Sequence, residues 1–161
     1  MKNVLLPTDL SLASLYPIHA ICKKAEGEKV NIYVIHTLDM PTGIMDLLFL
    51  QERKPYKMLP AGFLEAVEMM RKKYSSVINL LSFEFLWSNS RSVLRSYCQA
   101  RDIQAIYMLK DHAYKGHLPQ SVNSIPVLHK CKIPVVYASR VNKDEYGTLT
   151  ALLYREEKMH A

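Results

Sequence analysis

Short apolar runs alternate with amphipathic stretches along most of the chain. The runs are rich in Val, Ile, Leu, Phe and Tyr, and their composition and length predict strands. We expect these strands at Asn3 to Leu6, Val30 to His36, Leu80 to Trp87, Ile103 to Leu109 and Ile133 to Ala138. Strands that alternate with helices are typical of a parallel sheet covered on both faces. The pattern therefore predicts an α/β fold.

The amphipathic stretches predict helices between these strands. In the first, Ser14 can cap the helix, Pro17 falls in its first turn and Gly27 follows its end, while the inward side chains are Leu15, Ile18, Cys22 and Ala25. The second is the clearest, with one apolar stripe made of Phe63, Val67, Met70, Tyr74 and Val77. The third runs from about Arg91 to Arg101, and its inward residues are Val93, Leu94, Tyr97 and Cys98. A short fourth helix starts near Asn123 or Ser124 and ends near Lys130.

Two of the predicted strands differ in their surroundings. The run from Ile103 to Leu109 is almost continuously apolar, as expected of a strand buried on both faces. In the run from Leu80 to Trp87, the aromatic residues Phe83, Phe85 and Trp87 alternate with Ser82, Glu84 and Leu86. This alternation indicates an edge strand with one wetter face.

Two segments fit the alternating scheme poorly. Residues 40–60 hold an apolar run from Ile44 to Leu50 between prolines, and they could form a flap over a crevice or simply cover the core. The tail after Arg140 contains the apolar stretch from Thr148 to Tyr154, which is expected to pack on the domain or at a subunit interface. We therefore divide the chain into one domain, residues 1–139, and a C-terminal extension, residues 140–161.

Composition is that of an ordinary globular protein. The 161 residues are 49% hydrophobic and 22% charged, a length and composition that suit one domain with a substantial core. No apolar run reaches the roughly 18 residues of a membrane span, and the N-terminus lacks a secretory pattern, so a cytoplasmic protein is expected. The net charge is +6, but the lysines and arginines are scattered among acids, which favours solvated helix faces over nucleic-acid binding.

Three cysteines occur, Cys22, Cys98 and Cys131. They are too few and too widely spaced for a disulfide framework or a metal site. Two of them fall in apolar helix stripes, so buried reduced thiols are expected.

Three segments, KNVLLPTDLSLAS at the start, NIYVIHTLD in the second strand and HKCKIPVVYAS at the last, together resemble the universal stress protein family over about residues 1–139. The resemblance implies a Rossmann-like, five-stranded parallel sheet in the order 3-2-1-4-5 with helices on both faces. It also implies dimers formed along the last strand. In one branch of the family, ATP binds at the carboxyl ends of strands one and four.

The resemblance places an adenine or ribose contact on Asp9, with Pro7 and Thr8 beside it, and a backbone contact to adenine on Thr37. A carboxylate at a strand end can accept hydrogen bonds from an amine or a hydroxyl. Asp9 also suits a turn or a helix cap without any ligand, and that interpretation is slightly favoured.

The phosphate half departs from the family pattern, in which glycines let backbone N–H groups approach the phosphates. In this chain Leu109, directly after Met108, stands at the first of these glycine positions and His112 at the second. The third falls near Ser121 or Val122. ATP binding in the usual mode is therefore not expected. Lys110, His112 and Lys115, with His117, could instead hold a phosphate or a smaller anion through their side chains, or this stretch is a plain polar loop.

Sequence motifs for catalysis and for metal binding are missing from the chain. No serine has the flanking glycines of a nucleophile elbow, and no GK[ST] motif occurs. Asp111, His112 and His117 match no strong ligand spacing, so we expect no metal and no catalytic residue.

Two functions follow as expectations. The first is a non-enzymatic, dimeric stress-response protein that acts through an unidentified protein partner without a cofactor. The alternative is a sensor that binds an adenine nucleotide or another small anionic ligand through a modified phosphate loop. Bulky residues could also fill the crevice, namely Met108, Leu109, Met45, Leu48 and Phe49.

Overall fold

The sheet of the protein has five parallel strands. The computed structural model describes residues 1–39, 54–118 and 120–139. Its strands are β1 (Lys2–Pro7), β2 (Val30–Thr37), β3 (Ile78–Leu86), β4 (Ala105–Leu109) and β5 (Val135–Ala138), and they lie in the order β3-β2-β1-β4-β5. The predicted α/β fold and strand order are confirmed. Because the chain order reverses at β1, a crevice is expected at the carboxyl ends of β1 and β4.

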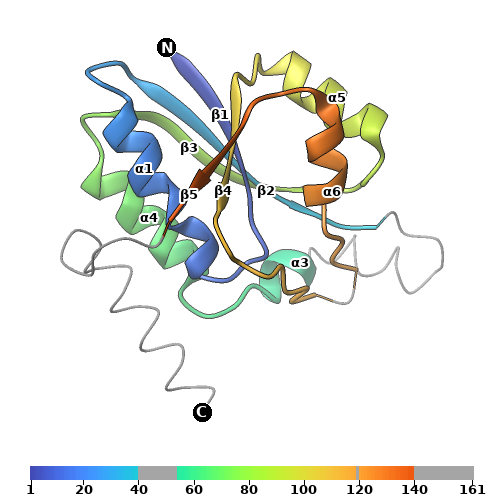
Figure 1. Ribbon diagram of the computed structural model, residues 1–161. Helices are drawn as coiled ribbons and strands as arrows, with labels where there is room; N and C mark the ends of the chain where they lie inside the picture. The colour runs from blue at the N-terminus through green and yellow to red at the C-terminus, as the bar shows by residue number, and fades with distance from the viewer. Residues whose placement is uncertain (40–53, 119, 140–161) are drawn as a thin grey trace.

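Helices cover both faces of this sheet (Figure 1). A 3₁₀ turn, η1 (Ala13–Leu15), leads into α1 (Pro17–Lys24), and α1 and α4 (Phe63–Lys73) pack on one face. On the other face lie α5 (Arg91–Ala100), α6 (Ile125–Leu128) and the 3₁₀ turn η2 (His129–Cys131). The short α3 (Lys54–Lys57) precedes α4.

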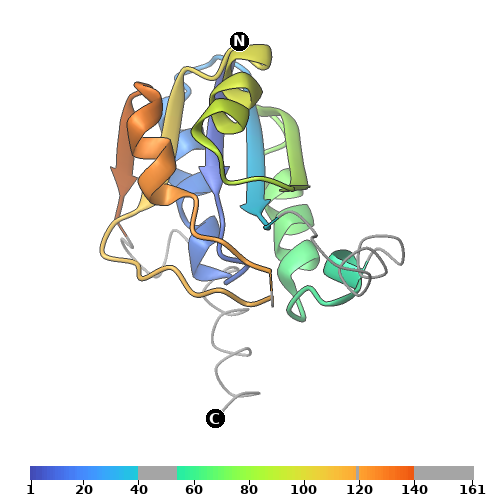
Figure 2. The same cartoon turned by 90° about the vertical axis from the view of Figure 1, so that its right-hand side faces the viewer.

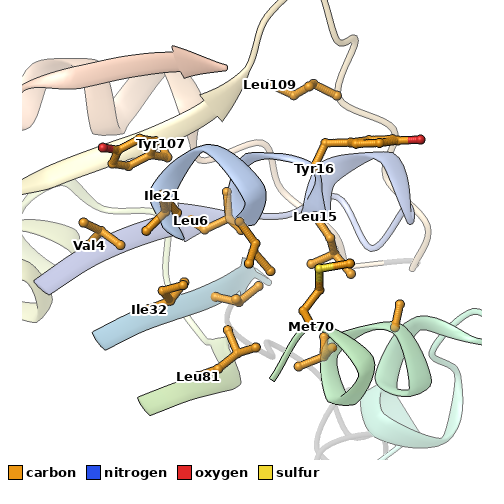
Figure 3. Packing of buried hydrophobic residues seen from close by; sticks show 14 of the residues in the cluster. Val4, Leu6, Leu15, Tyr16, Ile21, Ile32, Met70, Leu81, Tyr107 and Leu109 are labelled. Atoms are coloured by element: carbon orange, nitrogen blue, oxygen red, sulfur yellow. The ribbon is translucent and has the colours of Figure 1, made fainter. Parts of the chain in front are cut away.

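Two hydrophobic clusters fill the space between the helices and the sheet. Successive residues of β1 point to opposite faces, so Leu6 joins the cluster under α1 and α4 whereas Leu5 joins the one under α5 and α6. Figure 3 shows the first cluster, in which Leu15 and Met70 lie between the α1 segment and α4. A central strand contributes side chains to both clusters and is therefore apolar along its length. This explains the nearly continuous apolar sequence of β4.

Several details of the helices correct the sequence predictions. Ser14 does not cap α1; it lies within η1, where its Oγ donates to the carbonyl of Ser11, and α1 begins at Pro17. Val93 does not point inward: it lies in the first turn of α5 and is 39% exposed, and the buried residues of the helix are Leu94, Tyr97 and Cys98. Ser90 caps α5 by accepting a hydrogen bond from the backbone N–H of Val93 at 3.1 Å.

Strand positions agree with the sequence to within two residues. Ile103 and Ile133 precede β4 and β5, and β3 begins at Ile78 and ends before Trp87. The prediction that this third strand is an edge strand is confirmed, because β3 pairs only with β2. All three cysteines are free and buried, as predicted.

Some predictions fall outside the described residues. They concern residues 40–53 of the predicted flap, with Met45, Leu48 and Phe49, and the C-terminal extension from residue 140. Within the described part of the chain, no helix has the length and apolar character needed to cross a membrane.

Candidate functional site

The carboxyl ends of β1 and β2 are covered by the connection between β4 and α6, residues 110–118 and 120–123, which we call the covering loop (Figure 2). Its backbone is joined to the end of β2 by two hydrogen bonds. Val122 N donates to the Thr37 carbonyl at 3.0 Å, and Asp39 N donates to the Gln120 carbonyl at 2.9 Å. The loop thus takes the backbone acceptor of Thr37 that the sequence analysis assigned to adenine.

The side chain of Asp9 organises the turn that follows β1. Its Oδ1 accepts hydrogen bonds from the backbone N–H of Ser11 at 3.0 Å and from the Ser11 hydroxyl. Between them Leu10 is fully buried in a left-handed conformation with φ of 71°. An aspartate side chain that accepts a hydrogen bond from the backbone N–H two residues further on forms an Asx turn. This agrees with the sequence-based interpretation in which Asp9 stabilises a turn without any ligand.

The second carboxylate oxygen of Asp9 holds the covering loop. Oδ2 accepts from His112 Nε2 at 2.8 Å and from the backbone N–H of Lys115 at 3.0 Å. His117 Nδ1 donates to the main-chain carbonyl of Asp9. The Asp9 side chain is only 1% exposed, so donors of the protein itself surround the carboxylate.

These hydrogen bonds decide the charge state of Asp9. Burial by itself raises the pKa of the carboxyl, but hydrogen bonds from His112, Ser11 and Lys115 outweigh burial and hold the pKa well below its ordinary value of 3.8. Asp9 is therefore a buried carboxylate that is ionised and fully hydrogen-bonded.

A second connection joins His36, at the end of β2, to the covering loop. In the tautomer that satisfies all its neighbours, His36 Nδ1 donates to the Thr8 carbonyl at 2.8 Å and Nε2 accepts from the Ser121 hydroxyl at 2.7 Å. Ser121 Oγ in turn accepts from Leu118 N at 3.0 Å. His36 is fully buried, and burial lowers its pKa, so the ring is neutral.

Tyr114 completes the closure. Its ring stacks on the His36 imidazole with centroids 6.1 Å apart and planes 5° from parallel, and its hydroxyl donates to the Val122 carbonyl at 3.1 Å. Burial raises the pKa of this phenol above its ordinary range, so it stays protonated. The candidate ligand residues predicted from the sequence did not include His36 or Tyr114. The apolar setting of His36 at a strand end was a usable signal, whereas nothing local marked Tyr114.

A small cavity lies between the described residues of the covering loop and the strand ends. A cavity of about 20 Å³ persists there, lined by residues that include Asp9, Met108, His112 and Tyr114. Such a volume is about that needed for one water molecule, whereas sites for small molecules span roughly 300–1,000 Å³. This cavity, bounded by described residues, does not by itself accommodate a nucleotide.

The structure brings together only part of the predicted ligand set. Pro7, Asp9, Met108, Leu109 and His112 line the small cavity. Thr8 and Thr37 are buried, and Ser121 is engaged with His36. Lys110 and Lys115 are exposed, so their ammonium groups face solvent. A ligand role for any of these residues stays a prediction.

Metal binding has no geometric support in the part of the chain that the structure describes. No cluster of three or more His, Cys, Asp or Glu side chains there is placed to hold an ion. His112 and His117 both bond to Asp9, and Asp111 is exposed.

Solved structures share this fold at low sequence identity. Universal stress protein UspA from Lactobacillus plantarum aligns with a TM-score of 0.57 and 15% identity over 84% of this chain and 96% of its own. The hypothetical protein MJ0577 aligns with a TM-score of 0.57 and 16% identity, over 88% and 97%. A universal stress protein in complex with cAMP aligns with a TM-score of 0.50 and 15% identity, over 85% and 96%.

The chain therefore has the fold of universal stress proteins, and the resemblance inferred from its sequence is confirmed at the level of the fold. No protein-family model and no curated protein matches the sequence.

Proposed function

We propose that this chain is a non-enzymatic, dimeric stress-response protein of the universal stress protein type, which acts through protein partners and does not bind ATP in the usual mode. The observation that carries the proposal is the covering loop. Its residues occupy the carboxyl ends of β1 and β2 and leave a cavity of about 20 Å³.

Opening this crevice would carry a cost that a ligand must offset. Lys115 N and His112 would have to leave Asp9, Val122 N would leave Thr37, and Ser121 would leave His36. A neutral hydrogen bond contributes roughly 0.5–1.5 kcal/mol net and one to a charged group roughly 1.5–3 kcal/mol. Each 1.4 kcal/mol spent on opening weakens binding about tenfold. Weak ATP binding is the expected result.

The polar pairs at the crevice also favour a protein without enzymatic activity. Ser121 and His36 share the hydrogen bond of a nucleophile and its base. However, the Ser121 oxygen already accepts from Leu118 N, His36 is fully buried, and neither residue lines the small cavity. The hydroxyl is thus held within the hydrogen bonds of the loop, away from the small cavity.

A dimer along the last strand is supported by the edge position of β5. Tyr137 on this strand is 54% exposed, and Val135 and Val136 are half-buried, so the edge offers both backbone groups and apolar side chains. Tyr137→Lys and deletion of Val141–Ala161 should each weaken the dimer in sedimentation velocity. Unchanged sedimentation of both variants would contradict this part of the proposal.

Calorimetric titration with ATP and magnesium tests the central claim. We expect no saturable heat at about millimolar nucleotide. The matched variant is His112→Gly, which restores a glycine at a family glycine position and removes one hydrogen bond to Asp9. Micromolar binding by the unmodified protein, abolished in Asp9→Asn, would overturn the proposal.

A second candidate is a sensor of adenine nucleotides. It is favoured by the aligned universal stress protein in complex with cAMP and by the exposed Lys110 and Lys115 beside the crevice. In this case the covering loop must move to admit the ligand. Mass spectrometry of the supernatant after denaturing the purified protein distinguishes the candidates, because a sensor should release a bound nucleotide and a partner-binding protein should not.

A further inference from the structure

A groove of about 350 Å³ lies at the amino-terminal end of the sheet, opposite the crevice. It is bounded by the end of α5 with its link to β4, and by η2 with its link to β5, both at the amino ends of the strands (Figure 1). Its apolar lining residues are Ile103, Ile133 and Cys131. The volume falls within the range of roughly 300–1,000 Å³ that small-molecule sites occupy.

The rim of this groove carries more positive than negative charge. Arg95 and Lys132 line it together with one carboxylate, Asp102. Among residues 1–39, 54–118 and 120–139, no hydrogen bond or ion pair engages the side chain of Arg95 or Lys132. Arg95 also borders an adjoining hollow on α5 that is lined by Arg91 and two serines. Both cations line the groove, and neither forms an ion pair with Asp102 or with another carboxylate of the described residues.

Two charged residues of the rim occupy backbone positions that favour glycine. Lys132 has φ of 60° and ends η2, and Asp102 has φ of 49° just after α5. Glycine adopts this left-handed conformation without a steric cost, whereas a residue with a Cβ does not. Glycine would therefore fit the turn at position 132 without strain, so that position can lose its ammonium group without a change in the backbone.

We propose that this groove binds a small organic anion, a carboxylate or phosphate monoester with a compact apolar body. The guanidinium of Arg95 and the ammonium of Lys132 pair with the anionic head. The apolar body packs on Ile103, Ile133 and Cys131. Asp102 accepts a hydrogen bond from a hydroxyl or amine of the ligand and disfavours polyanions such as a triphosphate. The site is independent of the crevice and of the function proposed for it.

Amide chemical shifts followed by NMR test the proposal, with phenyl phosphate, phenol and inorganic phosphate as probes. Phenyl phosphate should cause saturable shifts at Gln99, Asp102 and Lys132 with a dissociation constant of about 1 mM or lower. Phenol lacks the charge and inorganic phosphate lacks the apolar body, so each should bind at least about tenfold more weakly.

Variants separate binding from folding. Lys132→Gly suits the left-handed backbone, so its melting temperature should equal or exceed that of the unmodified protein while phenyl phosphate binds about tenfold more weakly. Arg95→Gln should weaken binding to a similar extent. Lys130→Ala, which removes an exposed lysine of η2 outside the groove, is the matched control and should leave the affinity unchanged.

Any of several results would overturn the proposal. One is the lack of saturable shifts at about 10 mM phenyl phosphate. Others are equal affinity of the Lys132→Gly variant and the unmodified protein, and equal affinity for inorganic phosphate and phenyl phosphate. Shifts confined to Asp9 and the covering loop would also contradict it, because they would place the anion in the crevice.

Discussion

Replacement of Asp9 by asparagine tests whether this carboxylate holds the crevice closed. Asparagine keeps the size of the side chain and an oxygen that can accept from Ser11, so the Asx turn survives. Its amide group, however, places a donor where Oδ2 accepts from His112 Nε2 and Lys115 N at 2.8 and 3.0 Å. Two donors of the covering loop then face a third donor.

The cost follows from those two contacts. A hydrogen bond to a charged group contributes roughly 1.5–3 kcal/mol. The lower half of this range applies, because the His112 side chain is 15% exposed and Lys115 is exposed, so both donors can turn to water. We expect the free energy of unfolding to fall by about 3 kcal/mol for the pair.

Unfolding in urea measures the change in the free energy of unfolding of the whole domain, and native-state hydrogen exchange shows which residues lose protection. The amides of Lys115 and Val122 should exchange about tenfold faster or more in Asp9→Asn, because the covering loop is released, while the amide of Ile106 in β4 should follow only the global change. Asp111→Asn is the matched control. It removes an exposed carboxylate from the same loop at a φ of 56°, which asparagine tolerates, and should change stability by no more than about 0.5 kcal/mol.

The reasoning is refuted if Asp9→Asn unfolds with the same free energy as Asp111→Asn and the Lys115 amide exchanges at its original rate. Such a result would mean that the apolar contacts of Leu109 and Leu118 alone hold the covering loop in place.

Three further predictions concern pH and a helix cap. The stability difference between the unmodified protein and Asp9→Asn should be constant above about pH 5 and shrink as the pH falls below 3.8, because the folded-state pKa of Asp9 is lowered and the unfolded chain takes up the proton first. Burial, with Lys73 and Lys23 adding to it, lowers the pKa of His19 from 6.5 to about 3, so the unfolded state binds the proton first as the pH falls below 6.5. Between about pH 7 and pH 5.5, the free energy of unfolding in urea should fall by about 1 kcal/mol less in His19→Gln than in the unmodified protein, since His36, whose pKa burial also lowers, contributes to the fall in both. Ser90→Ala should lower the free energy of unfolding by about 1 kcal/mol, since Val93 N loses its acceptor at the start of α5, and equal urea midpoints for the two proteins would contradict the cap.

Much of the fold could be predicted from local pattern and from the resemblance together. The five apolar runs lie at the five strands because β1, β2 and β4 are buried on both faces and β3 is an edge. Errors arose where two local preferences competed. Ser14 looked like a helix cap, but η1 intervenes before α1 begins, and Val93 was predicted to point inward but lies exposed in the first turn of α5.

The sequence by itself determined the sheet, its order through the resemblance, the position of Asp9 at a strand end and the absence of glycine from the phosphate positions. The tertiary structure alone decided what those features do. Asp9 meets His112 across more than a hundred residues, and His36 meets Ser121 across 85. The periodicity of apolar residues shows which side of a helix or strand is buried. A hydrogen bond between distant polar side chains depends instead on how the tertiary fold brings their two backbone segments together. For the same reason, no local pattern in the sequence indicates that Arg95 and Lys132 line the same groove.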